Sequence, residues 1–257
     1  MSISERITQL LSKGDRPRKL AHAFYLLARW RERDLEQAVA QHHSGVVPAG
    51  PFAGLDVSGV RTELARALGV YEAALHPIIE EIIKTGYPTI IDVGCAEGYY
   101  VVGLALRMPA TTVHAREIDT AILARCQTLA ANNGVQERIQ FGGEVEHSFF
   151  DLCKTQKTLV ICDVEGAEND LIDPTKAPGL LDADILVECH DCFTRGLSEK
   201  IAQRFHATHD ISLIHRTTRQ DLLPDWMNDL DDLSRLVATW EHRPGPTPWL
   251  WMTRKNT

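Results

Sequence analysis

The sequence predicts an α/β fold in which a doubly wound, mostly parallel sheet of seven strands follows a helical N-terminal region. Three observations lead to this prediction. From residue 89 onward, short apolar runs alternate with segments whose apolar residues recur at the helical period. The first run, at 89–93, passes through a glycine turn into a helical pattern, as the opening unit of a parallel sheet does. The last two runs lie close to the C-terminus and predict a closing pair of strands at the sheet edge.

The first 85 residues are expected to be helical. Apolar residues recur near the helical period through 1–44, and a break at 14–17 separates two helices. A loop rich in glycine and proline follows at 44–59, and two more helices are predicted at 60–68 and 70–85, the second interrupted or started afresh near His76 and Pro77. We therefore divide the chain into an N-terminal helical region, 1–85, and a sheet domain, 86–257.

Strands and helices alternate after residue 88. The strands are predicted at 89–93, 111–117, 138–143, 158–163, 183–189, 210–216 and 248–254. The helices between them are predicted at 98–107, 120–132, 145–153, 167–172 and 196–206. Repeated strand–helix alternation implies right-handed crossovers between parallel strands. An insertion at 217–247, with a helix at 229–240, separates the last two strands.

Composition limits the class of protein. With 44% hydrophobic and 24% charged residues, the 257-residue chain has the make-up of a globular protein. Its 27 basic and 35 acidic residues give a net charge of −8, which argues against nucleic acid as a partner. No apolar run reaches the length of a signal peptide or a membrane span. Because the six cysteines are scattered and suit reduced thiols, we expect a cytoplasmic protein without membrane contacts.

The turn after the first strand predicts the kind of cofactor. A dinucleotide fingerprint needs three glycines in the order G-x-G-x-x-G, but residues 94–98 read G-C-A-E-G, with alanine at the middle position. The turn has no basic residue to meet a diphosphate, and the acids Asp92 and Glu97 favour a cationic ligand. S-adenosylmethionine, which has a sulfonium and an ammonium group, is therefore the expected cofactor. Its binding residues here are Asp92, Gly94, Cys95, Ala96 and Gly98.

Three further residues are expected around the nucleoside. Glu117 lies where the second strand ends, and a carboxylate there accepts hydrogen bonds from ribose hydroxyls. Ile118 is then placed to pack on the adenine face. Glu144 follows the third strand and either reads the adenine amine or caps the helix that starts nearby. The segment 69–72 precedes the core and is placed to fold over the amino-acid end of the cofactor.

Two separated motifs support a family resemblance. The string D-V-G-C-A-E-G-Y-Y at 92–100 and the string D-V-E-G-A-E at 163–168 resemble the FkbM-type branch of class I S-adenosylmethionine-dependent methyltransferases. The resemblance covers about residues 89–216. It implies a Rossmann-like, seven-stranded sheet, methyl donation from S-adenosylmethionine and frequent O-methylation of sugars or natural products.

The residues after the fourth and fifth strands are the candidates for catalysis. Asp163 and Glu165 follow the fourth strand, whose carboxyl end lies over the methyl group in this architecture. His190 follows the fifth strand and is the leading candidate for a general base, with Asp163 second. For Glu168 we favour a role at a helix N-terminus only.

Metal binding is weighed and not favoured. Cys189, Cys192, His206 and His209 have some of the residue types of a zinc site but not its spacing. A divalent ion held by Asp163, Glu188 or Asp191 is the better alternative. The arginines and tryptophans in and around 217–247 suit an acceptor pocket for a sugar or a carboxylate.

We therefore expect a methyltransferase that acts on an oxygen of a small molecule or saccharide. The alternatives are methylation of a protein or an RNA, or a non-catalytic nucleoside-binding module. The acceptor and the formation of homo-oligomers are left open by the sequence.

Overall fold

A seven-stranded sheet forms the centre of the molecule, and the computed structural model describes residues 3–11 and 16–255. The strands are β1 (Thr89–Val93), β2 (Thr112–Arg116), β3 (Ile139–Gly142), β4 (Thr158–Cys162), β5 (Ala183–Glu188), β6 (His209–Ile214) and β7 (Trp249–Arg254). Their order is β3-β2-β1-β4-β5-β7-β6, with β7 antiparallel to both neighbours and the other pairs parallel. The predicted Rossmann-like, mostly parallel sheet with its closing pair is confirmed.

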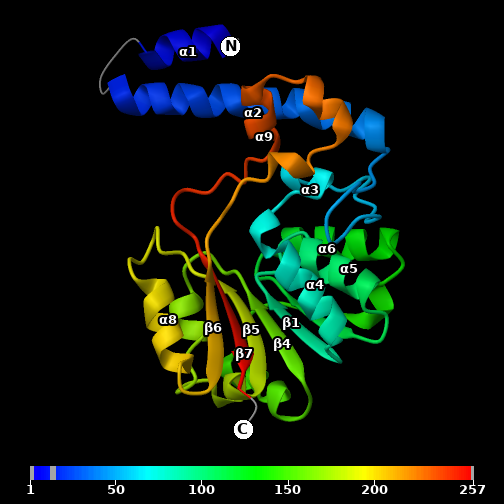
Figure 1. Cartoon of the computed structure of the whole chain (residues 1–257), viewed down its shortest axis with the longest axis vertical. Coiled ribbons are helices and arrows are strands. Elements are labelled where there is room, and N and C mark those ends of the chain that lie inside the picture. Colours follow the sequence, from blue (N-terminus) through cyan, green and yellow to red (C-terminus); the bar gives the residue numbers. More distant parts are fainter. Residues whose placement is uncertain (1–2, 12–15, 256–257) are drawn as a thin grey trace.

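Helices cover both faces of the sheet (Figure 1). One face carries α4 (His76–Thr85), α5 (Tyr99–Arg107) and α6 (Thr120–Asn132), and the other carries α8 (Leu197–Phe205) with the 3-10 helices η3 (His147–Lys154) and η4 (Pro178–Asp182). Ile90 packs with the first group and Ile91 with the second, as the alternation of side chains along a strand requires. All five residues of β1 are buried, which explains its apolar character.

The strand order creates a crevice at the carboxyl ends of β1 and β4. From β1 the chain moves outward to β2 and β3, and then returns to place β4 on the other side of β1. The loops after β1 and β4 therefore leave the sheet in opposite directions. Ligands of open α/β sheets bind at such a reversal point.

The N-terminal helices α1 (Ile3–Leu11) and α2 (Arg16–His43) lie at one end of the molecule, and α9 (Asp232–Ala238) of the insertion packs against α2 (Figure 1). The break predicted at 14–17 falls partly on residues 12–15, outside those described. In contrast, α3 (Leu64–Leu68) and α4 share one apolar cluster with β1, so the core of the sheet includes residues before 86. Within residues 3–11 and 16–255, no helix has both the length and the apolar character to cross a membrane.

Four predicted helices differ from the structure, and the one predicted at 229–240 is limited to α9, Asp232–Ala238. The helix predicted at 60–68 begins at Leu64, because Glu63 is extended. The helix predicted at 145–153 is the 3-10 helix η3, which starts after an extended Glu146 without a side-chain cap. The helix predicted at 167–172 is shortened to α7 (Glu168–Leu171). The remaining 3-10 turns are η1 (Ala73–Leu75), η2 (Gln136–Arg138), η5 (Gln220–Leu222) and η6 (Asp225–Asp229).

Candidate functional site

A cavity of about 770 Å³ opens at the carboxyl ends of β1 to β4. This volume lies in the range of small-molecule and cofactor sites. Its lining brings together six of the residues singled out in the sequence: Gly94, Glu117, Ile118, Glu144, Asp163 and Glu165.

The glycine turn is closely packed against the loop after β4. Gly94 has φ +81°, and a Cβ atom there would lie 1.7 Å from the carbonyl oxygen of Asp163. The backbone N–H groups of Gly94 and Cys95 both donate to the carbonyl oxygen of Arg116, at 2.9 and 3.1 Å. Gly98 has φ +94° and leaves no room for a Cβ beside Cys126. Glycine is therefore required at 94 and 98 by backbone conformation and by close approach.

The three residues predicted around the nucleoside surround the larger cavity. Glu117 accepts hydrogen bonds from the backbone N–H groups of Ala96, at 3.2 Å, and Asp119, at 2.9 Å, which hold its carboxylate over the turn. Ile118 lines the cavity and is 79% exposed. Glu144 is exposed, and the residue that precedes η3 is Glu146, so the helix-capping alternative for Glu144 is wrong.

A second, much smaller cavity adjoins the first and shares Gly94 and Asp163 with it. Its volume of about 30 Å³ has room for about two water-sized groups. Asp92 lies in its wall, is 3% exposed, and its Oδ2 atom has no hydrogen-bond partner among the described residues. Burial, together with the charges of Asp163 and Glu117, raises the pKa of Asp92 to about 8. The lining is Arg66, Tyr71, Asp92, Gly94, Cys95, Ala96, Tyr99, Tyr100, Ile161, Asp163 and Trp249.

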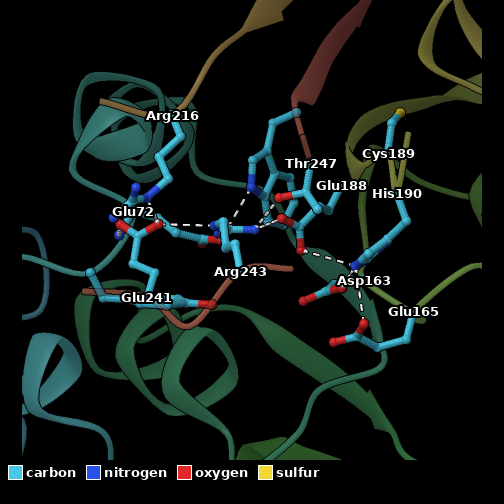
Figure 2. A network of polar contacts seen from close by, with 12 residues as sticks. Glu72, Asp163, Glu165, Glu188, Cys189, His190, Arg216, Glu241, Arg243 and Thr247 are labelled. Atoms are coloured by element: carbon cyan, nitrogen blue, oxygen red, sulfur yellow. Dashed lines mark hydrogen bonds and ion pairs between the residues drawn. The ribbon is translucent and has the colours of Figure 1, made fainter. Parts of the chain in front are cut away.

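His190 lies at the centre of a group of carboxylates next to these cavities (Figure 2). Its Nδ1 atom is 2.7 Å from Oε1 of Glu168. Its Nε2 atom is 3.3 Å from Glu165 and 3.8 Å from Asp163. Burial opposes the protonation of His190, but the hydrogen bond to Glu168 and the nearby negative charges outweigh it, so the pKa of His190 is raised. The structure thus brings together Asp163, Glu165 and His190, the three residues predicted as catalytic.

The backbone after β4 directs these carboxylates. Glu165 adopts φ +53°, an unfavourable conformation for a residue with a side chain, and presents its carboxylate to His190. Asp163 is directly bonded to the sheet through its N–H, which donates to the carbonyl oxygen of Val93. Burial and the charge of Glu72 raise the pKa of Asp163 above its usual range.

Two expectations about acids are corrected by the structure. Glu168 does more than favour a helix N-terminus: its side chain is fully buried and accepts from His190 and from the N–H groups of Val164 and Gly166. Burial opposes its ionisation, but these hydrogen bonds lower the pKa of Glu168 overall. Glu97, expected beside a cationic ligand, pairs instead with Arg66 at 3.2 Å and Arg125 at 3.8 Å, so its charge is already matched.

The side chains that have metal-ligand geometry in the described part of the chain are Asp163, Glu165 and His190, whose ligand atoms all lie within 4.8 Å of one another. Of the three acids named in the alternative, Asp163 belongs to this group, whereas Glu188 and Asp191 do not. Asp191 accepts from the N–H and hydroxyl of Ser198 at the start of α8, and Glu188 pairs with Arg243. The zinc-like set also separates, because His206 and His209 contact backbone carbonyl oxygens.

Arg243 of the insertion joins three parts of the chain. It pairs with Glu72 before β1, with Glu188 at the end of β5 and with Glu241 (Figure 2). Arg216 also pairs with Glu241, at 2.7 Å. Both arginines are therefore paired with buried carboxylates within the chain, and the expectation that they bind an acceptor stays a prediction.

Comparisons with known proteins complete the description. No protein-family model and no curated protein matches the chain. Among solved structures, it is similar to an O-methyltransferase from Bacillus cereus in complex with SAH, with 10% identity, TM-score 0.46 and coverage of 98% of this chain and 97% of that chain. It is also similar to the O-methyltransferase TomG from Streptomyces achromogenes, involved in tomaymycin synthesis and in complex with SAM, with 12% identity and a TM-score of 0.46. That match covers 77% of this chain and 93% of that chain. A putative O-methyltransferase from Klebsiella pneumoniae is similar with 9% identity and a TM-score of 0.46, and the match covers 99% of this chain and 96% of that chain.

Proposed function

We propose that this protein is an S-adenosylmethionine-dependent methyltransferase that methylates an oxygen of a small molecule or saccharide. The observation that carries the proposal is the pair of adjoining cavities that share Gly94 and Asp163. The larger cavity has the size for a nucleoside, and its lining includes an acid, Glu117, just after the second strand. The smaller one has buried, unpaired acidic oxygens, as a cationic amino-acid end requires.

The residues of the larger cavity suit the parts of a nucleoside. Glu117 is proposed to accept hydrogen bonds from the ribose hydroxyls, and Ile118 to pack on the adenine. Glu144 is proposed to accept from the adenine amine. Close packing at Gly94 and Gly98 lets the backbone of 94–98 approach the ligand. These assignments are also supported by the absence of a basic group in the turn itself.

The cluster around His190 is proposed to handle the acceptor. S-adenosylmethionine, when bound, supplies the methyl group, which leaves sulfur as the bond to the acceptor oxygen forms. The hydroxyl proton passes to Nε2 of His190, while Glu168 holds the ring through Nδ1. Asp163 and Glu165 flank Nε2 and stabilise the imidazolium that results. This assigns positioning and proton removal to the protein, which is what an in-line displacement needs.

Two finer assignments belong to the same proposal. Membership of the FkbM-type branch rests on the two sequence motifs at 92–100 and 163–168. A cytoplasmic location is supported by the six cysteines, which are all unpaired.

Calorimetric titration tests the proposal. The protein is titrated with S-adenosylmethionine, S-adenosylhomocysteine and NAD under the same conditions. We expect binding of the first two and none of NAD. Binding of NAD without binding of either methyl-donor compound would overturn the assignment. Release of S-adenosylhomocysteine in the presence of pooled hydroxylated small molecules and sugars then measures turnover.

A further inference from the structure

Arg66 is a partly buried arginine in the wall of the smaller cavity, contributed by α3 of the N-terminal region. Its Nη2 atom donates to the hydroxyl of Tyr71 at 3.1 Å, and its guanidinium lies 4.4 Å from the centre of the Tyr71 ring. Its Nη1 atom donates to Glu97 at 3.2 Å. The Nε atom is buried and has no hydrogen-bond partner in the described part of the chain.

The other walls of this cavity also carry unsatisfied polar atoms. Besides Arg66 Nε, three buried atoms of its lining residues have no hydrogen-bond partner among the described residues: Asp92 Oδ2, Tyr99 Oη and Asp163 Oδ1. The last of these lies 3.8 Å from Nε2 of His190, beyond hydrogen-bond distance. Buried polar atoms are nearly always hydrogen-bonded, so four such atoms in one small cavity indicate a polar ligand. The atoms belong to one cation, two acids and one neutral hydroxyl.

The charges around Arg66 leave it able to bind an anion. Glu97 is shared between Arg66 and Arg125, so two guanidinium groups face one carboxylate. This trio therefore has a net positive charge, and Arg66 is its member that lines the smaller cavity. The acids Asp92, near the end of β1, and Asp163, directly after β4, line the same cavity. An α-amino acid group, with its ammonium and carboxylate, has the matching charge distribution.

We infer that Arg66 binds the α-carboxylate of the methyl donor while Asp92 and Asp163 bind its α-ammonium group. The inference rests on the proposed function and extends the donor site into the N-terminal helical region. The room in the cavity, about 30 Å³, suits two small charged groups. Arg66 thereby distinguishes donors that retain the amino-acid end from nucleosides that lack it.

A pair of ligands isolates this contact. S-adenosylhomocysteine carries the amino-acid end, whereas 5′-methylthioadenosine has the same nucleoside and sulfur without it. We expect Arg66→Gln to lower the affinity for S-adenosylhomocysteine about 10- to 100-fold, because charge-assisted hydrogen bonds are lost. Affinity for 5′-methylthioadenosine should stay within about twofold. The affinity for decarboxylated S-adenosylmethionine should change as little in Arg66→Gln as the affinity for 5′-methylthioadenosine does.

Arg125→Gln is the matched control. It lies outside the lining of the smaller cavity but leaves Glu97 to pair with Arg66 alone. Affinity for 5′-methylthioadenosine should therefore be unchanged, and affinity for S-adenosylhomocysteine should fall less than in Arg66→Gln. Arg66→Lys, which keeps the charge, should give an intermediate loss and remains informative if Arg66→Gln folds poorly by circular dichroism.

The outcomes separate the two proposals. An equal loss for both ligands in Arg66→Gln and Arg66→Lys, or no loss for either ligand, overturns the role of Arg66 while leaving the methyl-donor site intact. Failure of the wild-type protein to bind either ligand overturns the proposed function itself.

Discussion

The Nδ1 atom of His190 lies 2.7 Å from Oε1 of Glu168, although the residues are 22 positions apart and follow different strands. The contact fixes the orientation of a buried imidazole whose Nε2 faces Asp163 and Glu165. It also connects the loop after β4 to the end of β5, since Glu168 accepts from the N–H groups of Val164 and Gly166. One buried carboxylate thus organises the side of the site proposed to meet the acceptor.

Glu168→Gln should lower the pKa of His190. The wild-type pKa is raised because the carboxylates outweigh burial, and removal of one opposite charge should lower it by about one unit or more. Side-chain NMR titration of the histidines measures this directly. Asp191→Asn is the control, since Asp191 contacts Ser198 instead. An unchanged pKa in Glu168→Gln would contradict the proposed coupling.

Turnover should rise with pH through the pKa of His190. The protonated imidazole cannot accept a proton, and its pKa is raised above 6.5, so activity appears as pH increases beyond that value. The pH dependence of kcat/KM measures it once an acceptor is in hand. In Glu168→Gln the rising limb should move to lower pH, and a limb that stays in place would assign the proton to another group.

Asp92→Asn should stabilise the ligand-free protein. Burial and the neighbouring acids raise the pKa of Asp92 to about 8, so the folded state binds the proton more tightly than the unfolded chain. Stability is then lost as pH rises between about 4 and 8. The neutral amide removes this loss, so we expect its gain in the free energy of unfolding to be larger at pH 8 than at pH 6 by about 2 kcal/mol. Urea denaturation at pH 6 and pH 8 tests this, and an equal effect at both would argue against ionisation as the cause.

Glu117→Ala should lower the affinity for every ligand that has a ribose. We expect about a 10- to 100-fold loss of affinity for both S-adenosylhomocysteine and 5′-methylthioadenosine, because two hydrogen bonds to a charged acceptor disappear. Calorimetry compares this variant with Glu117→Gln, which keeps an acceptor oxygen and should lose less. Equal affinities of wild type and Glu117→Ala would remove the ribose role.

Gly94→Ala should destabilise the protein more than Gly134→Ala. Both glycines have positive φ, but a Cβ at 134 meets open space whereas at 94 it lies 1.7 Å from a carbonyl oxygen. Holding an alanine in the left-handed backbone conformation costs about 1–2 kcal/mol at each position. Displacement of the loop at Asp163 adds about 1–3 kcal/mol at Gly94. Thermal unfolding of the pair tests the difference, and equal melting temperatures would show that the turn is free to relax.

Chelators should leave methyl transfer unchanged. In the proposed mechanism Nε2 of His190 accepts the hydroxyl proton, and a divalent ion bound by Asp163, Glu165 and His190 would compete with the proton for that side chain. Assays after dialysis against EDTA test this. Loss of activity that Mn²⁺ or Mg²⁺ restores would instead assign these three side chains to a metal centre.

The sequence by itself determined the sheet, the glycine turn and the acids at the strand ends. Apolar periodicity and turn chemistry act over a few residues, so β1 to β7 and the placement of Glu117 and His190 could be predicted. The pairing of Glu168 with His190 was missed, although Glu168 belongs to the D-V-E-G-A-E string. Arg66 had no sequence signal, because it precedes Asp92 in an ordinary helical segment.

Only the tertiary structure decided which charges meet. Arg66 reaches the smaller cavity because α3 packs on the core of the sheet. Arg243 is paired with Glu72 and Glu188 because the insertion folds back between β5 and the segment before β1. Local patterns specify elements, whereas the partner of a buried charge depends on how distant elements pack.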